Sequence, residues 1–295
     1  MGVVGLFFAV VTGVELPGTC ANDATCAETL RPILPDTCSW SPTVRLSKSS
    51  QRRHPHGLCW VSQEKRYVYL NIAKVASTSL KRLTSGPSGG RALQSKCDIA
   101  SDGTITSFRP SLGRGEYGEA VNATGFFVFG FVRDPVRRFL SGFHTVAKRG
   151  AAGGAYGDSK RMPFVRVVHD EHAQMEAFFH DVAKNSGPWE EHTAPQTHYL
   201  SHPQSRTPVK MDFVGRVEQL EDGWRQIENS IGLSSVPSLP RRNAAERSTV
   251  VPNPVSLEEL QNDDDMLLKV CRLYAQDFSC LNYSLPRVCL ETTDR

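Results

Sequence analysis

The sequence predicts an α/β fold in which helices flank a central, mostly parallel sheet. The prediction depends on continuous runs of β-branched and aromatic residues at 66–73 and 125–132, which are typical of strands buried on both faces. A helix-like segment follows each run, and a third run at 211–217 also leads into one. Strands that alternate with helices favour parallel pairing, with the ligand site at the carboxyl ends of the strands.

The bulk composition is that of a globular protein. The chain has 295 residues, of which 39% are hydrophobic and 22% charged, and its net charge is +3. These values exclude a disordered chain and a strongly basic one. We therefore expect no nucleic-acid partner, although a local basic cleft for an anionic ligand is compatible with this charge.

The N-terminal region predicts entry into the secretory pathway. Residues 1–14 are almost wholly apolar, and their length fits the core of a signal peptide better than a full membrane span of about 20 residues. We interpret residues 1–18 as a signal peptide or a short signal-anchor, with a buried N-terminal segment as the alternative. Residues 19–60 carry several prolines and predict an irregular stem, and an ordered domain is expected over 61–290.

The cysteine pattern is consistent with that route. No CxxC pair is present, which argues against a zinc ribbon and permits disulfides in an oxidising compartment. Unpaired buried thiols are the alternative. Glycosylation triplets begin at Asn122 and Asn282. The cysteines are Cys20, Cys26, Cys38, Cys59, Cys97, Cys271, Cys280 and Cys289.

The turn after the first strand has the features of an anion cradle. A lysine and several small hydroxyl residues stand where a helix begins, and the N–H groups at a helix N-terminus attract phosphate or sulfate. An ordinary turn, capped by Ser77 or Thr78, is the competing interpretation. The residues predicted to hold the anion are Lys74, Val75, Ala76, Ser77, Thr78 and Ser79.

The turn after the second strand is similar. Arg133 is followed by Asp134, a plausible N-cap, and by Pro135, which suits the first helical turn. A helix is expected over about 135–148, with Ser141 two turns from its start. A ligand with two anionic ends would use both turns.

The remaining segments carry weaker signals. Residues 91–120 are loop-rich with short elements that the pattern does not assign, and 232–255 is a loop with prolines and arginines. Apolar residues at helical spacing predict helices over about 170–184 and 256–278. Three aspartates at 263–265 lie in the last helix and are interpreted as a solvated face rather than a metal site.

With these two turns the chain resembles the Golgi carbohydrate sulfotransferases. This group includes the HNK-1, chondroitin and dermatan 4-O- and uronyl sulfotransferases. The two turns resemble that family's Pro-Lys-x-x-Ser-Thr-Ser-like loop and Arg-Asp-Pro turn. The segments 192–195, 213–221 and 273–278 resemble three further family motifs in the same order. Ala73 replaces the usual proline and Thr193 the usual tryptophan, which leaves the loop entry and the acceptor wall in question.

The resemblance implies a P-loop-like three-layer sandwich that transfers a sulfuryl group from 3′-phosphoadenosine-5′-phosphosulfate (PAPS) to a carbohydrate hydroxyl in the Golgi lumen. Lys74 and the residues through Ser79 would hold the 5′-phosphosulfate, and Arg133 with Ser141 the 3′-phosphate. His192 is the candidate base, with Glu218 as the second candidate. The acceptor is expected to be a glycan, and both neutral and anionic glycans are candidates.

Several alternatives stay open. His192 could be a structural histidine, and the chain could be a non-catalytic glycan-binding protein that keeps the fold. A P-loop kinase is disfavoured because G-x-x-x-x-G-K-[ST] is missing. No metal is expected, since no carboxylate or thiolate completes a set with His169 and His172, or with His192, His198 and His202. A loop with Arg241, Arg242, Arg247 and Ser248 would close over the nucleotide, attract an anionic glycan or simply be solvated.

Overall fold

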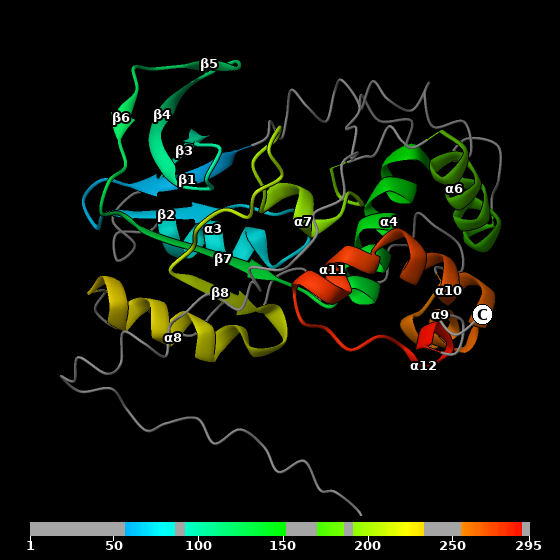
Figure 1. Cartoon of the computed structure of the whole chain (residues 1–295). Coiled ribbons are helices and arrows are strands. Elements are labelled where there is room, and N and C mark those ends of the chain that lie inside the picture. Colours follow the sequence, from blue (N-terminus) through cyan, green and yellow to red (C-terminus); the bar gives the residue numbers. More distant parts are fainter. Residues whose placement is uncertain (1–56, 86–91, 152–169, 186–190, 233–254, 291–295) are drawn as a thin grey trace, which may run out of the picture. The chain divides into compact units, whose positions relative to one another are not determined.

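The computed structural model describes residues 57–85, 92–151, 170–185, 191–232 and 255–290 (Figure 1). All of them belong to one compact unit, Pro32–Arg295. Its centre is an eight-stranded sheet with the order β5-β4-β3-β1-β2-β7-β8, and β6 pairs with β4. Helices flank this sheet, so the predicted α/β class is confirmed.

The parallel part of the sheet consists of β2 (Tyr67–Leu70), β7 (Phe127–Val132) and β8 (Phe213–Arg216). Each strand lies inside one of the apolar runs that predicted it. Tyr69 pairs with Phe129 and Phe129 with Phe213, so aromatic rings form a row across the three strands. All of β2 is buried, as its continuous apolar sequence predicts.

The other half of the sheet is antiparallel, so the sheet is mixed rather than mostly parallel. It comprises β1 (Leu58–Ser62), β3 (Leu93–Ile99), β4 (Ile105–Gly113), β5 (Glu116–Tyr117) and β6 (Val121–Asn122). The connection between β1 and β2 is too short for a crossover helix, and a short connection joins antiparallel neighbours. β1 begins at Leu58, within the residues that the sequence assigned to the stem.

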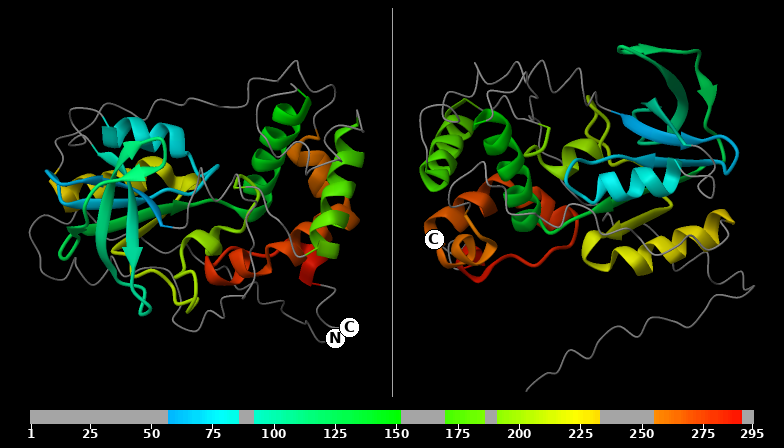
Figure 2. Two further views of the ribbon diagram at one scale, coloured as in Figure 1. Left: turned by 90° about the horizontal axis from the view of Figure 1, so that it is seen from above. Right: turned by 180° about the vertical axis from the view of Figure 1, so that it is seen from behind.

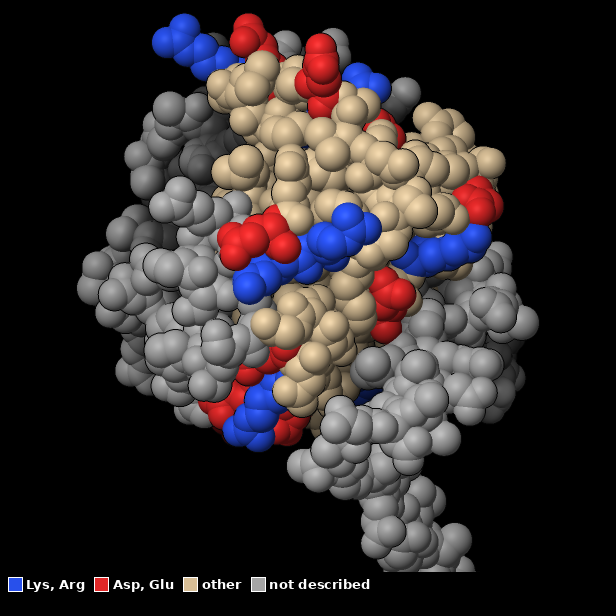
Figure 3. Space-filling model, turned by 90° about the vertical axis from the view of Figure 1, so that its left-hand side faces the viewer, with Lys and Arg blue, Asp and Glu red and all other residues tan. Residues whose placement is uncertain are grey.

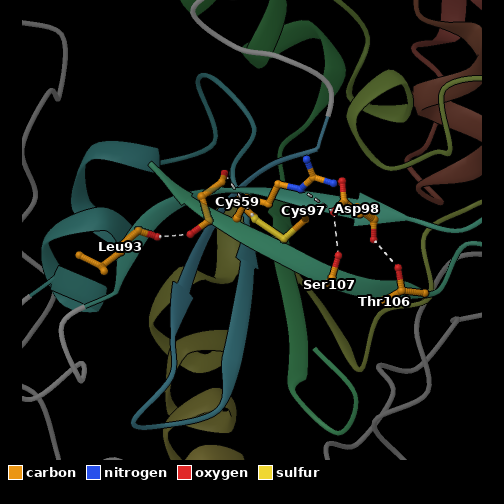
Figure 4. The surroundings of a disulfide bond; sticks show 8 residues. Cys59, Leu93, Cys97, Asp98, Thr106 and Ser107 are labelled. Carbon is orange, nitrogen blue, oxygen red and sulfur yellow. Dashed lines mark hydrogen bonds and ion pairs between the residues drawn. A yellow bond between two sulfur atoms is a disulfide. The ribbon is translucent and has the colours of Figure 1, made fainter. Parts of the chain in front are cut away.

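Disulfide bonds tie the sheet and the C-terminal helices internally. Cys59 of β1 is bonded to Cys97 of β3, beside a polar cluster in which Asp98 accepts a hydrogen bond from Ser107 at 2.7 Å (Figure 4). Cys271 is bonded to Cys289. In the described part of the chain every cysteine is disulfide-bonded, which argues against the interpretation of these residues as unpaired buried thiols.

Two helices, α3 (Ser77–Ser85) and α8 (Leu220–Ile231), cover the same face of the parallel strands. Tyr67 of β2 donates a hydrogen bond to the Thr84 carbonyl of α3 at 3.2 Å. Phe129 of β7 contacts Tyr67 and also Trp224 of α8. Figure 2 shows both helices in front of the strands when the molecule is seen from behind.

A group of helices packs beyond the carboxyl end of β7 (Figure 1). Its centre is Phe139, whose ring lies 5.3 Å from the ring of Phe179 and 5.8 Å from that of Tyr274. One helix of this group directly follows the Arg133 turn, so the group adjoins the candidate functional site. Its members are α4 (Pro135–Ala151), α6 (Glu171–Asn185), α7 (Gln196–Tyr199), α9 (Leu257–Asn262), α10 (Asp264–Leu273), α11 (Ala275–Cys280) and α12 (Arg287–Leu290).

The prediction of one helix over 256–278 was wrong, because α9, α10 and α11 occupy this span. Asp263 has an extended backbone and accepts a hydrogen bond from the Met266 N–H at 2.9 Å, so it is the N-cap of α10. Ser256 and Glu259 form a capping box at the start of α9. Asp263 is therefore a helix cap rather than part of a solvated helical face.

Charges of both signs lie side by side on the face shown in Figure 3. The described ion pairs include Lys210 with Asp102 at 2.7 Å and Arg109 with Asp98 at 3.3 Å.

Among the described residues no helix is long and apolar enough to cross a membrane. The predicted signal peptide or anchor at 1–18 lies outside the described residues.

Candidate functional site

The Lys74 loop, residues 71–76 between β2 and α3, has an unusual backbone. Lys74 and Ala76 have φ angles of 70° and 57°, in the left-handed region that residues other than glycine rarely adopt. Left-handed residues that alternate with residues of negative φ, as Lys74 and Ala76 do around Val75, can turn successive backbone N–H groups toward a common point, as in anion-binding nests. Val75 between them is fully buried and anchors the loop in the core. The loop is thus held in a strained form of the kind that often marks a ligand site.

Helix α3 begins directly at this loop. The carbonyl of Ala76 accepts hydrogen bonds from the Ser79 and Leu80 N–H groups at 2.9 and 3.1 Å. The first N–H groups of a helix have no acceptor within the helix and carry its positive dipole end. Ser77 is half-buried, Thr78 is exposed and Ser79 is buried, so the three predicted hydroxyls have different surroundings. The backbone of the first turn is the common feature that suits an anion.

The side chain of Lys74 reaches across to α4. Its Nζ donates a hydrogen bond to Thr145 Oγ1 at 2.8 Å, and Thr145 Oγ1 donates to the Ser141 carbonyl at 3.1 Å. Lys74 and Ser141, which the sequence assigned to opposite ends of a ligand, are therefore linked through one threonine. Thr145 was not predicted, although its spacing of four residues from Ser141 places both on one face of the helix.

The Arg133 turn lies next to the Lys74 loop because β7 pairs with β2 in parallel. Arg133 Nη1 donates a hydrogen bond to the Lys74 carbonyl at 3.4 Å. Burial lowers the pKa of Arg133, and the neighbouring Glu218 carboxylate opposes this effect. A guanidinium that stays charged in such a partly desolvated place attracts an anion more strongly than it would in water.

Asp134 is the N-cap of α4, as predicted, and its carboxylate accepts a hydrogen bond from the Arg137 N–H at 2.8 Å. Burial is the main cause that raises the pKa of Asp134. Its own N–H donates to Glu218 Oε1 at 2.9 Å, and Glu218 Oε2 accepts a hydrogen bond from the Tyr283 hydroxyl at 3.1 Å. Both oxygens of Glu218 thus hold the turn in place, which favours a structural role for this residue over that of a base.

Arg138 was also missed from the sequence. It is fully buried on α4 and its Nε donates a hydrogen bond to the Ala73 carbonyl at 3.2 Å. Arg138 precedes Ser141 by three residues, a spacing that places it on the same helical face. It therefore fixes the entry to the Lys74 loop, where Ala73 replaces the usual proline.

His192 comes to the same helix from another part of the chain. Its side chain is 11% exposed, and its Nδ1 lies 3.9 Å from Glu191 Oε1. Its backbone packs against Gly142, where a Cβ atom would lie only 2.2 Å from the His192 carbonyl oxygen. Gly142 therefore allows the segment of His192 to approach the helix directly beside Ser141.

Thr193 is the residue that replaces the usual tryptophan and thereby left the acceptor wall in question. It is fully buried, and its carbonyl accepts a hydrogen bond from the Tyr274 hydroxyl at 2.5 Å. Its methyl group would lie 3.4 Å from a Cβ atom at Gly142. This residue packs between α4 and the C-terminal helices and does not line an exposed surface.

His144 is a further titratable group near Lys74. Its Nε2 is 3.0 Å from the carbonyl oxygen of Val255, which can only accept, so this nitrogen carries the proton. Burial lowers the pKa of His144, the bond to Val255 opposes the shift, and the positive charge of Lys74 adds to it. The imidazole beside Lys74 is therefore kept neutral.

Other predicted residues do not join the site. His202 Nδ1 accepts a hydrogen bond from the Ser205 N–H at 2.9 Å in an exposed loop. The described residues contain no group of three metal-ligating side chains. The loop with Arg241, Arg242, Arg247 and Ser248, and also His169, lies outside the described residues.

Comparison with known proteins agrees with this arrangement. The model of the sulfotransferase family matches residues 58–284, more than half of the chain, and the match spans both turns and His192. Comparison with curated proteins and with solved structures gave no match. On the extent of the family match, the chain belongs to the sulfotransferase family.

Proposed function

We propose that this protein transfers a sulfuryl group from PAPS to a hydroxyl group of a carbohydrate. The observation that carries the proposal is the pair of strand-to-helix turns at the ends of the parallel strands β2 and β7. They meet where Arg133 Nη1 contacts the Lys74 carbonyl, and each is followed by a helix N-terminus. Two such sites side by side suit a ligand with two separate anionic groups.

The residues around the turns fit PAPS. Lys74 and the amides that begin α3 suit the phosphosulfate, and Arg133 with Ser141 suits the 3′-phosphate. Asn71 is the first residue of the Lys74 loop, directly after β2, and is 3% exposed. Neither its Oδ1 nor its Nδ2 has a hydrogen-bond partner in the described part of the chain. A buried amide of this kind usually has a partner, and a polar ligand can supply one.

The chemistry requires positioning and neutralisation of charge rather than a covalent intermediate. One sulfur–oxygen bond, to the leaving phosphate, breaks while another, to the acceptor oxygen, forms. Lys74 would stabilise the negative charge that develops on the phosphate oxygen, together with the N–H groups of Ser77 and Thr78. His192 would take the proton of the acceptor hydroxyl, and a neutral imidazole is suited to accept it.

The acceptor class and the compartment are further parts of the proposal. The motifs that the chain shares with Golgi enzymes support a glycan acceptor, and an anionic one is compatible with the cations of the site. The disulfides Cys59–Cys97 and Cys271–Cys289 support passage through an oxidising compartment. We propose the Golgi lumen as its compartment.

The direct test is transfer of labelled sulfate from PAPS to a panel of glycans. Lys74→Ala should abolish transfer while the thermal unfolding midpoint stays close to that of the wild type. Lys210→Ala is the matched control, because Lys210 is exposed and pairs with Asp102 away from both turns. A Lys74→Ala protein with near-normal activity would refute the role of Lys74.

Binding of adenosine 3′,5′-bisphosphate without transfer to any acceptor would instead favour a non-catalytic glycan-binding protein. A wild-type protein that binds ATP with magnesium but not the bisphosphate would favour a kinase. Each result contradicts the proposal in a different way.

A further inference from the structure

The backbone of Arg133 is held by a side chain from a distant segment. The Arg133 N–H donates a hydrogen bond to Gln196 Oε1 at 2.8 Å, and Gln196 Nε2 donates to the Arg133 carbonyl at 2.8 Å. A neighbouring strand would make the same pair of bonds, but the ladder between β7 and β8 ends one residue earlier, at Val132 and Arg216. The amide of Gln196 thus extends the sheet by one residue.

The backbone of Gln196 is in turn held by the carboxylate of Asp277. Its N–H donates a hydrogen bond to Asp277 Oδ2 at 2.8 Å, and the Thr197 N–H donates to Asp277 Oδ1 at 2.9 Å. The residue at the N-cap of α7 is Pro195, which makes no side-chain capping bond. Asp277 of α11 therefore caps α7 from another part of the chain. Gln196 and Asp277 are both fully buried, so water does not compete for these bonds.

This arrangement controls the direction of the Arg133 side chain. A residue whose N–H and carbonyl are both bonded has little freedom in its backbone angles, and its side chain leaves the backbone in one direction. In this structure that direction brings the guanidinium to the Lys74 carbonyl, between the two turns. Without the amide, the turn would keep the bond of Asp134 to Glu218 but lose its two bonds at Arg133.

We propose that Gln196 is a positioning residue that aims Arg133 at the 3′-phosphate and thereby sets the selectivity of the site for 3′-phosphorylated nucleotides. The inference rests on the proposed function, since it assumes that Arg133 meets the 3′-phosphate. Asp277 supports the same geometry by holding Gln196. The residue acts through Arg133 and needs no contact with the nucleotide.

The test compares the affinities of the purified full chain for adenosine 3′,5′-bisphosphate and adenosine 5′-phosphate by calorimetry. Gln196→Met keeps the length of the side chain and removes both bonds, and Gln196→Asn keeps the amide but shortens its reach. The preference for the bisphosphate should fall by about tenfold or more in both variants, as expected for loss of a buried polar contact. Affinity for the 5′-phosphate should stay within about twofold, because the Lys74 loop is unchanged.

The matched control is Gln219→Met, because Gln219 is exposed and makes no side-chain cap of α8. Kinetics give a second readout: misaimed Arg133 raises KM for PAPS, whereas simple instability lowers the active fraction and hence kcat. Folded variants that keep the wild-type preference would overturn the inference, and so would failure of both variants to fold, which would make the amide a folding requirement only. A wild-type protein without any preference would instead contradict the proposed cofactor.

Discussion

Replacement of Gly142 by alanine tests whether the approach of the His192 segment to α4 matters for catalysis. In an isolated helix this change stabilises by up to about 1 kcal/mol, because glycine is a poor helix former. Here the new Cβ would lie 2.2 Å from the His192 carbonyl oxygen and 2.9 Å from its carbon. An ordinary contact of a Cβ atom is 3.4–4 Å, so the two backbones must separate by about 1.2 Å or more.

The contact is between two backbones, so no flexible side chain can relieve it. We expect a net loss of about 1–3 kcal/mol in the free energy of unfolding, as in other overpacked sites. A shift of about 1 Å in a catalytic group can reduce the rate about 100-fold. We therefore expect kcat to fall by about this factor, while KM for PAPS changes little because both turns are intact.

The assay is transfer of labelled sulfate under saturating PAPS, with the unfolding midpoint measured on the same samples. Gly118→Ala is the control, since the nearest atom to its added Cβ would be the Pro110 carbonyl oxygen at 3.7 Å, an ordinary contact. If Gly142→Ala retained the wild-type kcat and stability, the close packing of His192 on α4 would have no functional meaning.

Three further predictions concern ionisable groups. His192→Ala should reduce kcat by about 100-fold or more. Glu218→Ala should destabilise by about 1–3 kcal/mol through its two lost bonds yet keep kcat within a few fold; the reverse order in transfer assays would make Glu218 the base. Because the pKa of His144 is lowered in the folded state, the unfolded state binds more protons, and stability should fall as the pH drops below about 6.5, by at most about 1.4 kcal/mol per pH unit. His144→Gln should flatten this slope in denaturation series from pH 7.5 to 5, and an unchanged slope would contradict the assignment.

Secondary structure could be predicted from the sequence where the residues of one short segment determine it. The buried strands at Tyr67 and Phe127 and the cap at Asp134 follow from local composition, and the structure contains them. Strands β3 and β4 were not predicted because they lack an apolar run: β4 alternates irregularly and contains Pro110, a residue that argues against a strand. Strand β1 is apolar but only five residues long, and it lies at the edge of the proline-containing segment that was assigned to the stem. The break at Asp263 was hidden because apolar spacing continues through it.

Hydrogen bonds between residues that are far apart in the sequence could not be predicted. Gln196 and Asp277 are 81 residues apart, and neither lies in a pattern that indicates the other. Arg138 and Thr145 could have been found, because they share a helical face with Ser141. What the spacing could not reveal is that this face meets Ala73 and Lys74, which depends on how α4 packs on the end of the sheet.

Helix α4 also fixes the spacing of the residues that hold the Lys74 loop. Arg133 stands two residues before the helix, Arg138 and Ser141 lie along one face, and Thr145 holds Lys74 about three turns from the start of the helix. From Pro135 to Thr145 the axis advances by about 15 Å, at 1.5 Å per residue. One rigid helix therefore sets the spacing of the residues that hold the Lys74 loop, so substitutions at single positions of α4 change its contacts without changing the distances between them.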